Sequence, residues 1–237
     1  MRAWLLLLVA PSLACAEPVW VGRFAESGAI PEPWQVEHLN KDYPPTRFGL
    51  RLWDGVPAVE AHADKSMALL ARPVEVDLQR TPILCWRWRV AAPLKTADMT
   101  TKAGDDYAAR VYLSFEVPPD TLGLGTRLAL KLARALRGDQ VPDAAVNYVW
   151  DNTHPIGTWQ ANAYTDRARM LVLRTGSADA ARWVTERRDV TADFSRAFGH
   201  APRRLTGLAL ASDTDNTGET AHAGFADFRF VGRDEGC

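Results

Sequence analysis

The sequence predicts a single all-β domain, a β-sandwich that carries one inserted helix. Two stretches lead to this prediction, residues 83–90 (ILCWRWRV) and 107–117 (YAARVYLSFEV). In each stretch, apolar side chains alternate with polar ones, which is the period of a strand with one face on a core. Roughly ten to thirteen short segments of this kind follow one another between turn residues, as in sandwiches and barrels.

The remaining strands are expected where β-branched and aromatic residues lie between Gly, Pro, Asn and Asp. Asp54-Gly55 marks a hairpin that joins strands over 47–53 and 56–61. The other expected strands cover residues 20–24, 67–71, 74–78, 144–150, 168–174, 182–190, 205–212 and 221–231.

One segment has a helical period instead. Leucines recur every four residues, at Leu124, Leu128, Leu132 and Leu136. This spacing places them on one face of a helix that ends at Gly138. We expect an amphipathic helical insertion over about 122–138, packed across an open end of the sandwich. Binding to a membrane surface is an alternative, because the segment also carries four basic residues.

Composition and charge limit the class of protein. The 237 residues are 47% hydrophobic and 24% charged, with a formal net charge of -1. This composition is typical of a globular domain, and the near-neutral charge argues against a nucleic-acid partner. After the N-terminal run, no segment has the roughly 18 consecutive apolar residues of a transmembrane helix. The oligomeric state is left open.

The first sixteen residues have the pattern of a secretory signal peptide. A positively charged start precedes an apolar run, and Ala14-Cys15-Ala16 is a small-x-small cleavage site. Cleavage there would leave residues 17–237 as a periplasmic or secreted domain. A lipoprotein anchored through Cys15 is the alternative, although Ser12 stands where such signals usually have a large aliphatic residue.

Two cysteines, Cys85 and Cys237, remain after this cleavage. The interpretation that we favour is a buried free Cys85 and a free Cys237, because unpaired cysteine is often buried in a core. The alternative is one disulfide between them, because exported proteins meet oxidising conditions.

The polar face of the two central strands provides the first candidate site. The planar guanidinium group of arginine suits bidentate recognition of carboxylate, sulfate or phosphate, and arginines on adjoining strands would form an anion-binding concavity. Aromatic side chains nearby could stack on a sugar ring. The candidate ligand-binding residues are Arg87, Arg89, Arg110, Tyr112, Asn147, Trp150, Glu186 and Arg188. The alternative is an outer face on which cross-strand Arg–Glu pairs neutralise the arginines.

Acidic loops provide a second candidate site. The run DTDNTG at 213–218 places oxygen ligands at alternating positions, as calcium loops do. An EF-hand that begins at Asp213 would need a glutamate where the sequence has Gly224. A calcium site of another type stays open, and its candidate ligands are Asp213, Asp215, Asp105 and Asp106. The alternative is a turn whose side chains cap their own backbone. No other cofactor is expected.

Signals for catalysis are weaker. Paired carboxylates can hydrolyse glycosidic bonds, and the candidates are Asp105, Asp106, Glu116 and Glu186. Elimination from a uronate would need an arginine beside a base, with Tyr112, Tyr148 and His154 as candidates. The sequence has no G-x-S-x-G or H-E-x-x-H motif and no phosphate-binding glycine loop. Whether the protein is an enzyme is left open, with binding alone preferred.

Five blocks of sequence resemble a family of exported bacterial proteins that is catalogued as a domain of unknown function. They are WRWRV at 86–90, KAGDD at 102–106, NYVW at 147–150, ERR at 186–188 and DTDNT at 213–217. The resemblance implies one β-sandwich domain and an envelope location, and no established activity. The final strand also looks like the end of jelly-roll carbohydrate-binding domains. The expected fold is therefore an all-β, jelly-roll-like antiparallel β-sandwich with one inserted amphipathic helix.

Three functional hypotheses follow. The first is an exported binding protein of the bacterial envelope that recognises an acidic saccharide or another small anionic ligand on the arginine-rich face. The second is an enzyme that cleaves polysaccharide, a hydrolase or a lyase, in the same cleft. The third is a structural partner in envelope assembly that uses the helix of 124–136 as its contact.

Overall fold

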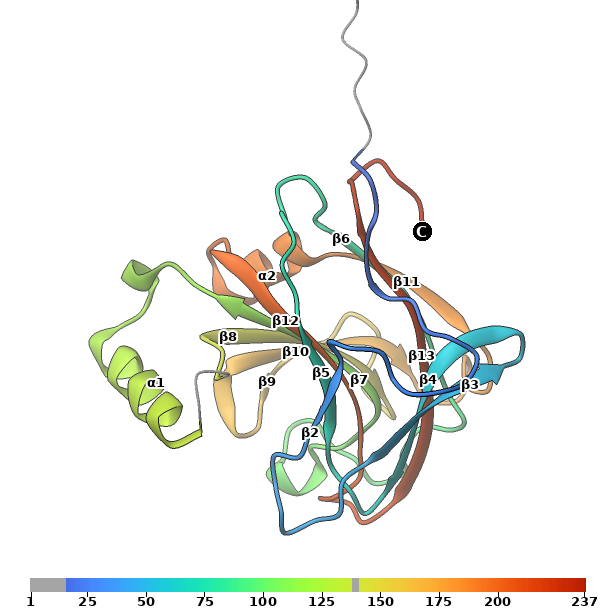
Figure 1. Ribbon diagram of the computed structural model, residues 1–237. Coiled ribbons are helices and arrows are strands. Elements are labelled where there is room, and N and C mark those ends of the chain that lie inside the picture. The colour runs from blue at the N-terminus through green and yellow to red at the C-terminus, as the bar shows by residue number, and fades with distance from the viewer. Residues whose placement is uncertain (1–15, 138–140) are drawn as a thin grey trace, which may run out of the picture.

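The computed structural model describes residues 16–137 and 141–237, without the side chains of 132–137. Two β-sheets pack face to face, and two α-helices lie outside them (Figure 1). This arrangement confirms the predicted β-sandwich. Sheet A has six strands in the order β11-β6-β13-β4-β3, with β1 also paired to β13. These are β1 (Val19–Gly22), β3 (Arg47–Trp53), β4 (Val56–Asp64), β6 (Ile83–Val90), β11 (Val184–Asp189) and β13 (Thr220–Val231).

Sheet B has seven strands in the order β2-β5-β12-β7-β8-β10-β9. These are β2 (Gln35–Glu37), β5 (Leu69–Pro73), β7 (Tyr107–Glu116), β8 (Ala144–Asp151), β9 (Trp159–Asn162), β10 (Thr165–Thr175) and β12 (Arg204–Asp213). Strands β8 and β10 form a parallel pair within the predicted antiparallel sandwich. The reason is that β9 lies between them in sequence, and its hairpin with β10 restores the direction of β8. Residues 74–78, expected as a strand, are loop and turn because Pro73 ends β5.

The core lies between the sheets and is rich in aromatic side chains. Trp86 of β6 stacks on Tyr148 of β8 with 5.3 Å between ring centroids, and Trp88 packs on Trp150 at 5.7 Å. All four side chains are buried. The alternation in the two central strands therefore predicted the inward faces correctly. Burial of each such ring contributes about 1.5–3 kcal/mol to the free energy of unfolding.

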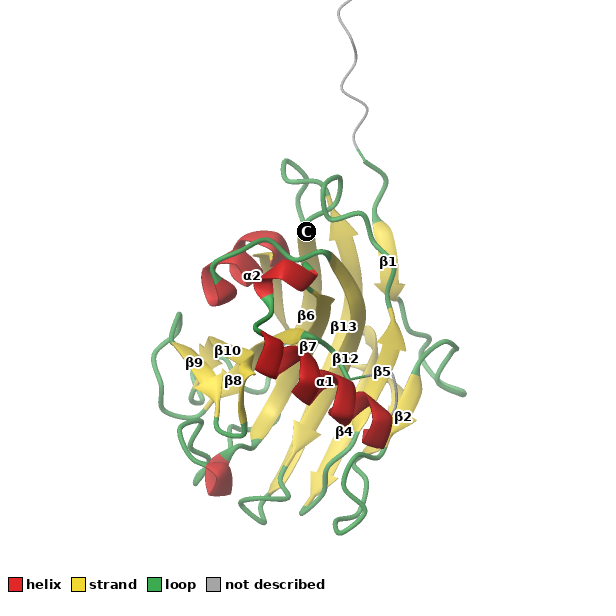
Figure 2. Ribbon diagram, turned by 90° about the vertical axis from the view of Figure 1, so that its left-hand side faces the viewer, coloured by secondary structure: helices red, strands yellow, loops and turns green. Residues whose placement is uncertain are grey.

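The inserted helix α1 (Leu124–Arg137) connects β7 to β8 through η2 (Pro119–Thr121), at the predicted place. It stands on the sheet B side of the sandwich (Figures 1 and 2). Leu124 and Leu128 are 83% and 70% exposed, whereas Leu130 is buried. The prediction that the leucine stripe packs on the sandwich is therefore wrong for Leu124 and Leu128. The helix face that carries Leu130 is the one turned toward the protein. The side chains of Leu132 and Leu136 lie outside the described part of the chain.

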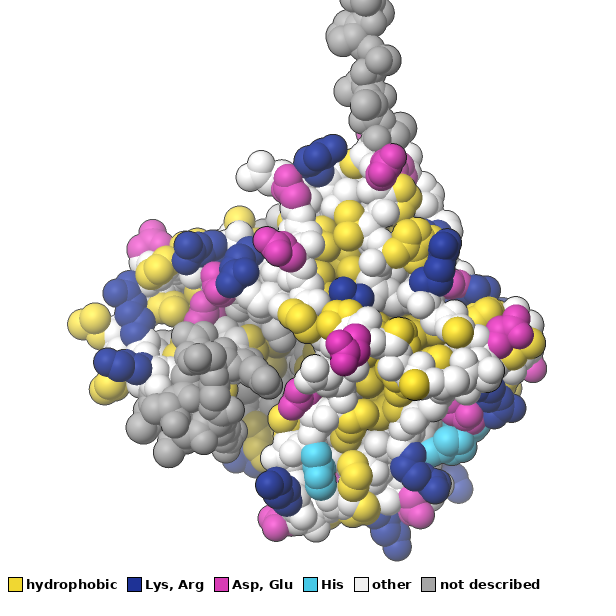
Figure 3. Space-filling view, viewed as in Figure 1, with side chains coloured by type: hydrophobic (Ala, Val, Ile, Leu, Met, Phe, Trp, Pro, Cys, Tyr) yellow, Lys and Arg dark blue, Asp and Glu magenta, His cyan; other side chains and the backbone are white. Residues whose placement is uncertain are grey.

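Hydrophobic and basic side chains consequently share the outer surface of α1 (Figure 3). Neither described helix has the length and hydropathy needed to cross a membrane.

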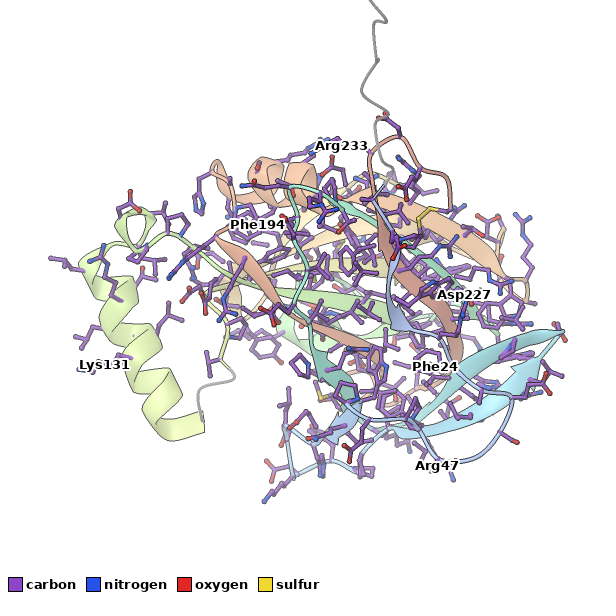
Figure 4. The ribbon with its side chains drawn as sticks, turned by 45° about the horizontal axis from the view of Figure 1, so that its top comes forward. Phe24, Arg47, Lys131, Phe194, Asp227 and Arg233 are labelled. Carbon is purple, nitrogen blue, oxygen red and sulfur yellow. A yellow bond between two sulfur atoms is a disulfide. The ribbon has the colours of Figure 1, made fainter. Side chains whose placement is uncertain are left out.

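A second helix, α2 (Val190–Phe198), begins where the sequence predicts the end of a strand. The side chain of Asp189 accepts a hydrogen bond from the backbone N–H of Ala192 at 2.9 Å and caps the helix. Gly199, with φ of 78°, ends it in the left-handed conformation. Phe194 then packs on Phe115 of β7 at 4.6 Å between ring centroids, which anchors α2 on the core (Figure 4).

Cys85 and Cys237 form a disulfide, with 5.6 Å between their Cα atoms. The favoured prediction of two free thiols is therefore wrong, and the alternative is confirmed. The reason is that the chain turns back after β13 and runs beside β11. There Arg187 donates hydrogen bonds to the backbone carbonyls of Arg233 and Glu235. This contact holds the terminal segment beside β6, where Cys85 lies.

Candidate functional site

The predicted arginine-rich face is divided between the two outer surfaces of the sandwich. Strand β6 belongs to sheet A and β7 belongs to sheet B. Arg87 and Arg89 therefore point outward on one side of the molecule, and Arg110 points outward on the other. The predicted concavity that would combine these arginines is wrong. Alternation in sequence assigns the two faces of a strand, but it does not say to which sheet the strand belongs.

The arginines of sheet A have carboxylate partners. Arg87 donates from Nε to Asp227 Oδ2 at 2.5 Å. Arg89 forms an ion pair with Asp54 and donates to the carbonyl oxygen of Ala181 at 2.9 Å. The alternative of a neutralised outer face therefore describes sheet A, with aspartates as partners in place of the expected glutamates.

Three further candidate residues have structural contacts. Trp150 is a core residue and not a platform for a sugar, and its Nε1–H donates to a backbone carbonyl at 3.1 Å. Glu186 accepts hydrogen bonds from Trp88 Nε1 at 3.0 Å and from Arg174 Nε at 2.6 Å. Arg188 pairs with an aspartate of α2. The side chains of Glu186 and Arg188 thus tie β11 to its neighbours.

The other predicted residues meet on the outer surface of sheet B. Strand β7 supplies an arginine and two tyrosines, β8 an asparagine and β12 an aspartate, and the loops that precede β7 and follow β12 supply three more aspartates. We call this group the Arg110 site, and it consists of Arg110, Tyr107, Tyr112, Asn147, Asp105, Asp106, Asp213 and Asp215. The arginine face and the acidic loops, which the sequence presents as two candidates, thus contribute to one site.

The strand register makes room for the long side chains of this site. Arg110 lies opposite Ala211 of β12, and Tyr112 lies opposite Ala209. A shift in the pairing of β7 with β12 occurs just before Arg110. Tyr107 would point into the core if β7 were regular, but this bulge turns it to the outer face. Sequence alternation therefore missed Tyr107.

A long loop before β7 folds back over the sheet and carries the first two aspartates. Met99 from this loop is buried against Tyr107, and η1 (Lys102–Gly104) follows it. A Cβ atom on Gly104 would lie 2.5 Å from the backbone nitrogen of Asp98, so only glycine fits there. Close packing at this point fixes the position of Asp105.

Arg110 lies at the centre of the site between two tyrosine rings. Its guanidinium carbon is 4.8 Å from the ring centroid of Tyr107 and 4.4 Å from that of Tyr112. Its Nη1 atom is 3.7 Å from both Asp105 Oδ1 and Asp213 Oδ2. Hydrogen-bonded ion pairs are about 1 Å shorter than this. Both pairs are therefore open.

Polar atoms in this centre lack hydrogen-bond partners among the described residues. They are Arg110 Nε, Asp105 Oδ1 and Asp213 Oδ1, and the three residues are only 4%, 7% and 2% exposed. A buried polar atom left without a partner costs about 1–3 kcal/mol, so such atoms usually meet water or a ligand. Tyr112 and Asp215 lie beside this buried centre and are themselves partly exposed.

Burial and neighbouring carboxylates change the protonation of the site. Burial raises the pKa of Asp213 well above its usual range even though Arg110 opposes the change. Burial, and then Asp106, raises the pKa of Asp215 to about 6. Burial disfavours the charged form of Arg110, but Tyr112 and the two aspartates raise its pKa and keep it a cation.

Three carboxyl groups come within 4.8 Å of one another, those of Asp106, Asp213 and Asp215. The Asp106 oxygens accept four hydrogen bonds from the backbone and side chains of Asn216 and Thr217. An aspartate of another loop therefore caps this turn, whereas the alternative to a calcium loop expected the turn's own side chains to do so. The nearby cation of Arg110 also disfavours a divalent ion at these carboxyl groups.

Residues from the β9–β10 hairpin complete the edge of the site. Asn162 donates from Nδ2 to Asp105 Oδ2 at 2.7 Å, and the exposed Tyr164 donates to Asn216 Oδ1 at 3.2 Å. Sequence reasoning missed these two residues, because the short strand β9 has no alternating pattern of its own.

Comparison with known proteins identifies the family of the chain. A family model described as "Protein of unknown function (DUF3047)" matches residues 32–229, and the chain belongs to this family. No curated protein sequence matches it.

Two solved structures are similar in fold over most of their length. One is the family 30 carbohydrate-binding module of the cellulosomal cellulase Cel9D-Cel44B of Clostridium thermocellum, with 9% identity, a TM-score of 0.38, and coverage of 92% of this chain and 95% of that one. The other is the xyloglucanase domain of NopAA, a type three effector from Sinorhizobium fredii, in complex with cellobiose. Its identity is 10% and its TM-score 0.45, with coverage of 90% of this chain and 99% of that one. Both TM-scores are below 0.5, so neither likeness bears on the ligand of this protein.

Proposed function

We propose that this member of the DUF3047 family is an exported protein that binds a neutral saccharide at the Arg110 site. The observation that carries the proposal is the open centre of the site, where Arg110 Nε, Asp105 Oδ1 and Asp213 Oδ1 are buried and have no hydrogen-bond partner in the described part of the chain.

A sugar hydroxyl group has the chemistry that this centre lacks. A hydroxyl oxygen accepts a hydrogen bond while its proton is donated to another acceptor. One hydroxyl group beside Arg110 and Asp105 can accept from the guanidinium and donate to the carboxylate, each at about 2.8 Å. Adjacent hydroxyl groups on one sugar ring supply several such bonds at once, whereas water molecules must be ordered one by one.

The charge of the site favours a neutral ligand over the acidic one expected from the sequence. At pH values above about 6, where Asp215 is ionised, a single guanidinium faces the carboxyl groups of Asp105, Asp106, Asp213 and Asp215. The site is then net negative. A uronate or phosphate would meet repulsion from these groups, and the second arginine that would offset it lies on sheet A.

A glycan-binding assay tests the proposal. The protein is applied to immobilised neutral oligosaccharides of glucose, mannose and galactose and to uronate oligomers. Asp105→Asn removes an acceptor at the centre, and Arg87→Gln is the matched control on sheet A. We expect the protein and the control to bind a neutral glycan, and Asp105→Asn to bind it at least tenfold more weakly, as for a buried polar contact. Circular dichroism confirms that each variant is folded.

Absence of binding to every neutral glycan, or equal binding by Asp105→Asn, would overturn the proposal.

One observation favours a second candidate, a glycoside hydrolase. Burial raises the pKa of Asp213 well above its usual range, and Asp213 lies close to the carboxyl groups of Asp106 and Asp215. Carboxyl groups whose pKa values are pushed apart can divide the roles of acid and base in hydrolysis of a glycosidic bond. Release of reducing ends from the polymer that binds would support it, with loss of turnover in Asp213→Asn. If the polymer binds and no reducing ends are released, the hydrolase is rejected and the protein binds saccharide without cleaving it.

A further inference from the structure

Two histidines and a glutamate converge on the outer surface of sheet A, on the opposite side from the Arg110 site. His62 of β4 and His222 of β13 are cross-strand neighbours, and Glu60 lies on the same face two residues before His62. Both Nε2 atoms point to one carboxylate oxygen, Glu60 Oε1, at 2.8 Å from His62 and 2.5 Å from His222. The ligand atoms of the three residues lie within 4.8 Å of one another.

The surrounding residues hold this group in place. Gly224 is the cross-strand partner of Glu60, so no side chain there keeps the glutamate from reaching His222. The ring of His222 is stacked between that of Trp53, at 4.3 Å between centroids, and that of His62, at 4.0 Å. Stacking on both sides fixes the orientation of His222, as supporting contacts do for metal-binding histidines.

We propose that Glu60, His62 and His222 bind a divalent metal ion of the zinc class. Two imidazole nitrogens and one carboxylate are ligands that Zn²⁺ takes in proteins, often with a water as the fourth ligand. Bonds of about 2.0–2.2 Å in tetrahedral geometry place ligand atoms about 3.3 Å apart, so modest rotation of the side chains completes the site. The side chain of His62 is 45% exposed and can rotate, and solvent supplies the fourth ligand.

One competing contact sets the affinity. Arg51 donates to Glu60 Oε1 at 2.7 Å and must release it when the metal binds. The Arg51 side chain is 44% exposed, so this release is a local movement at the surface.

Titration calorimetry of the untagged protein with Zn²⁺ tests the site, with Co²⁺ absorption as a second readout of tetrahedral coordination. The variants are His62→Gln, Glu60→Gln and Arg51→Ala, with His38→Gln as a control histidine outside the cluster. We expect one ion per chain, affinity lowered at least tenfold in His62→Gln and Glu60→Gln, and no change in the control. Arg51→Ala should bind Zn²⁺ more tightly, which a purely structural hydrogen-bond network would not predict.

No heat of binding at millimolar Zn²⁺, or binding that His62→Gln and Glu60→Gln leave unchanged, would overturn the proposal. Because both substitutions are on the surface of a strand, a melt of each variant separates loss of the site from loss of the fold.

Discussion

Arg110 of β7 and Asp213 of β12 face each other on the outer surface of sheet B, with 3.7 Å between Nη1 and Oδ2. This distance is about 1 Å too long for a hydrogen-bonded ion pair, and burial raises the pKa of Asp213 well above its usual range. Arg110 thus keeps donors for another acceptor, and Asp213 keeps an oxygen without a partner among the described residues. This relationship makes the centre of the site complementary to hydroxyl groups.

Asp215 should make the stability of the protein depend on pH. Its pKa is about 6 in the folded protein and 3.8 in the reference state, so the folded state binds the proton more tightly. The contribution of Asp215 is fully present below about pH 4 and is lost as the pH rises through about 6. Between pH 4 and 7, the free energy of unfolding of the protein should therefore fall by about 1–2 kcal/mol, and that of Asp215→Asn should not show this decrease. The value takes into account that Asp215 is partly exposed.

Urea unfolding at a series of pH values measures this difference. Curves of unfolding free energy that stay parallel for the protein and the variant would contradict the assignment.

The disulfide should account for a large part of the unfolding free energy. It joins residues that are 152 positions apart, so it restricts the unfolded chain strongly. Cys237→Ser should lower the free energy of unfolding by about 2–5 kcal/mol. Urea unfolding of the reduced protein should match that of the variant. If neither reduction nor the Cys237→Ser substitution changes the midpoint of urea unfolding, the disulfide does not form in solution.

Gly104 should be needed for the site as well as for the fold. In Gly104→Ala the new Cβ atom would clash with the backbone of Asp98 and displace Asp105. We expect a loss of about 1–3 kcal/mol in unfolding free energy together with weaker saccharide binding. Gly49→Ala is a matched control, because no heavy atom lies within 4 Å of the position that its new methyl group would take. Equal affinity in Gly104→Ala and Gly49→Ala would show that the loop does not position Asp105.

Calcium should not stabilise the protein. The oxygens of Asp106 are engaged by the turn that follows β12, and the cation of Arg110 lies beside Asp213. A thermal melt with millimolar Ca²⁺ should therefore match one with Mg²⁺. A rise in midpoint that is specific for Ca²⁺ and is lost in Asp213→Asn would restore the calcium loop.

The alternation of apolar residues was sufficient to predict the strands and the inward faces of β6 and β7. It could not assign β6 and β7 to different sheets, because that depends on pairing between distant segments. The arginines of the two strands consequently looked like one surface. The acidic loops and Arg110 looked separate for the same reason, although the register of β7 with β12 brings them together.

Irregular features account for the other differences. A bulge turns Tyr107 outward against the parity of its strand. The disulfide depends on the path of six residues after β13, which carry no periodic signal. The helix of 124–137 has a clear period, but periodicity does not say how closely a helix approaches the sheet.

Selection of neutral saccharides by the Arg110 site can be measured by titration calorimetry with two matched ligands. The ligands are the neutral oligosaccharide selected in the glycan assay and its uronate counterpart of equal length. We predict that the neutral ligand binds at least tenfold more tightly, that Asp105→Asn removes this binding, and that Arg87→Gln does not. Tighter binding of the uronate, or neutral binding that Asp105→Asn leaves intact, would contradict the proposed role of the site.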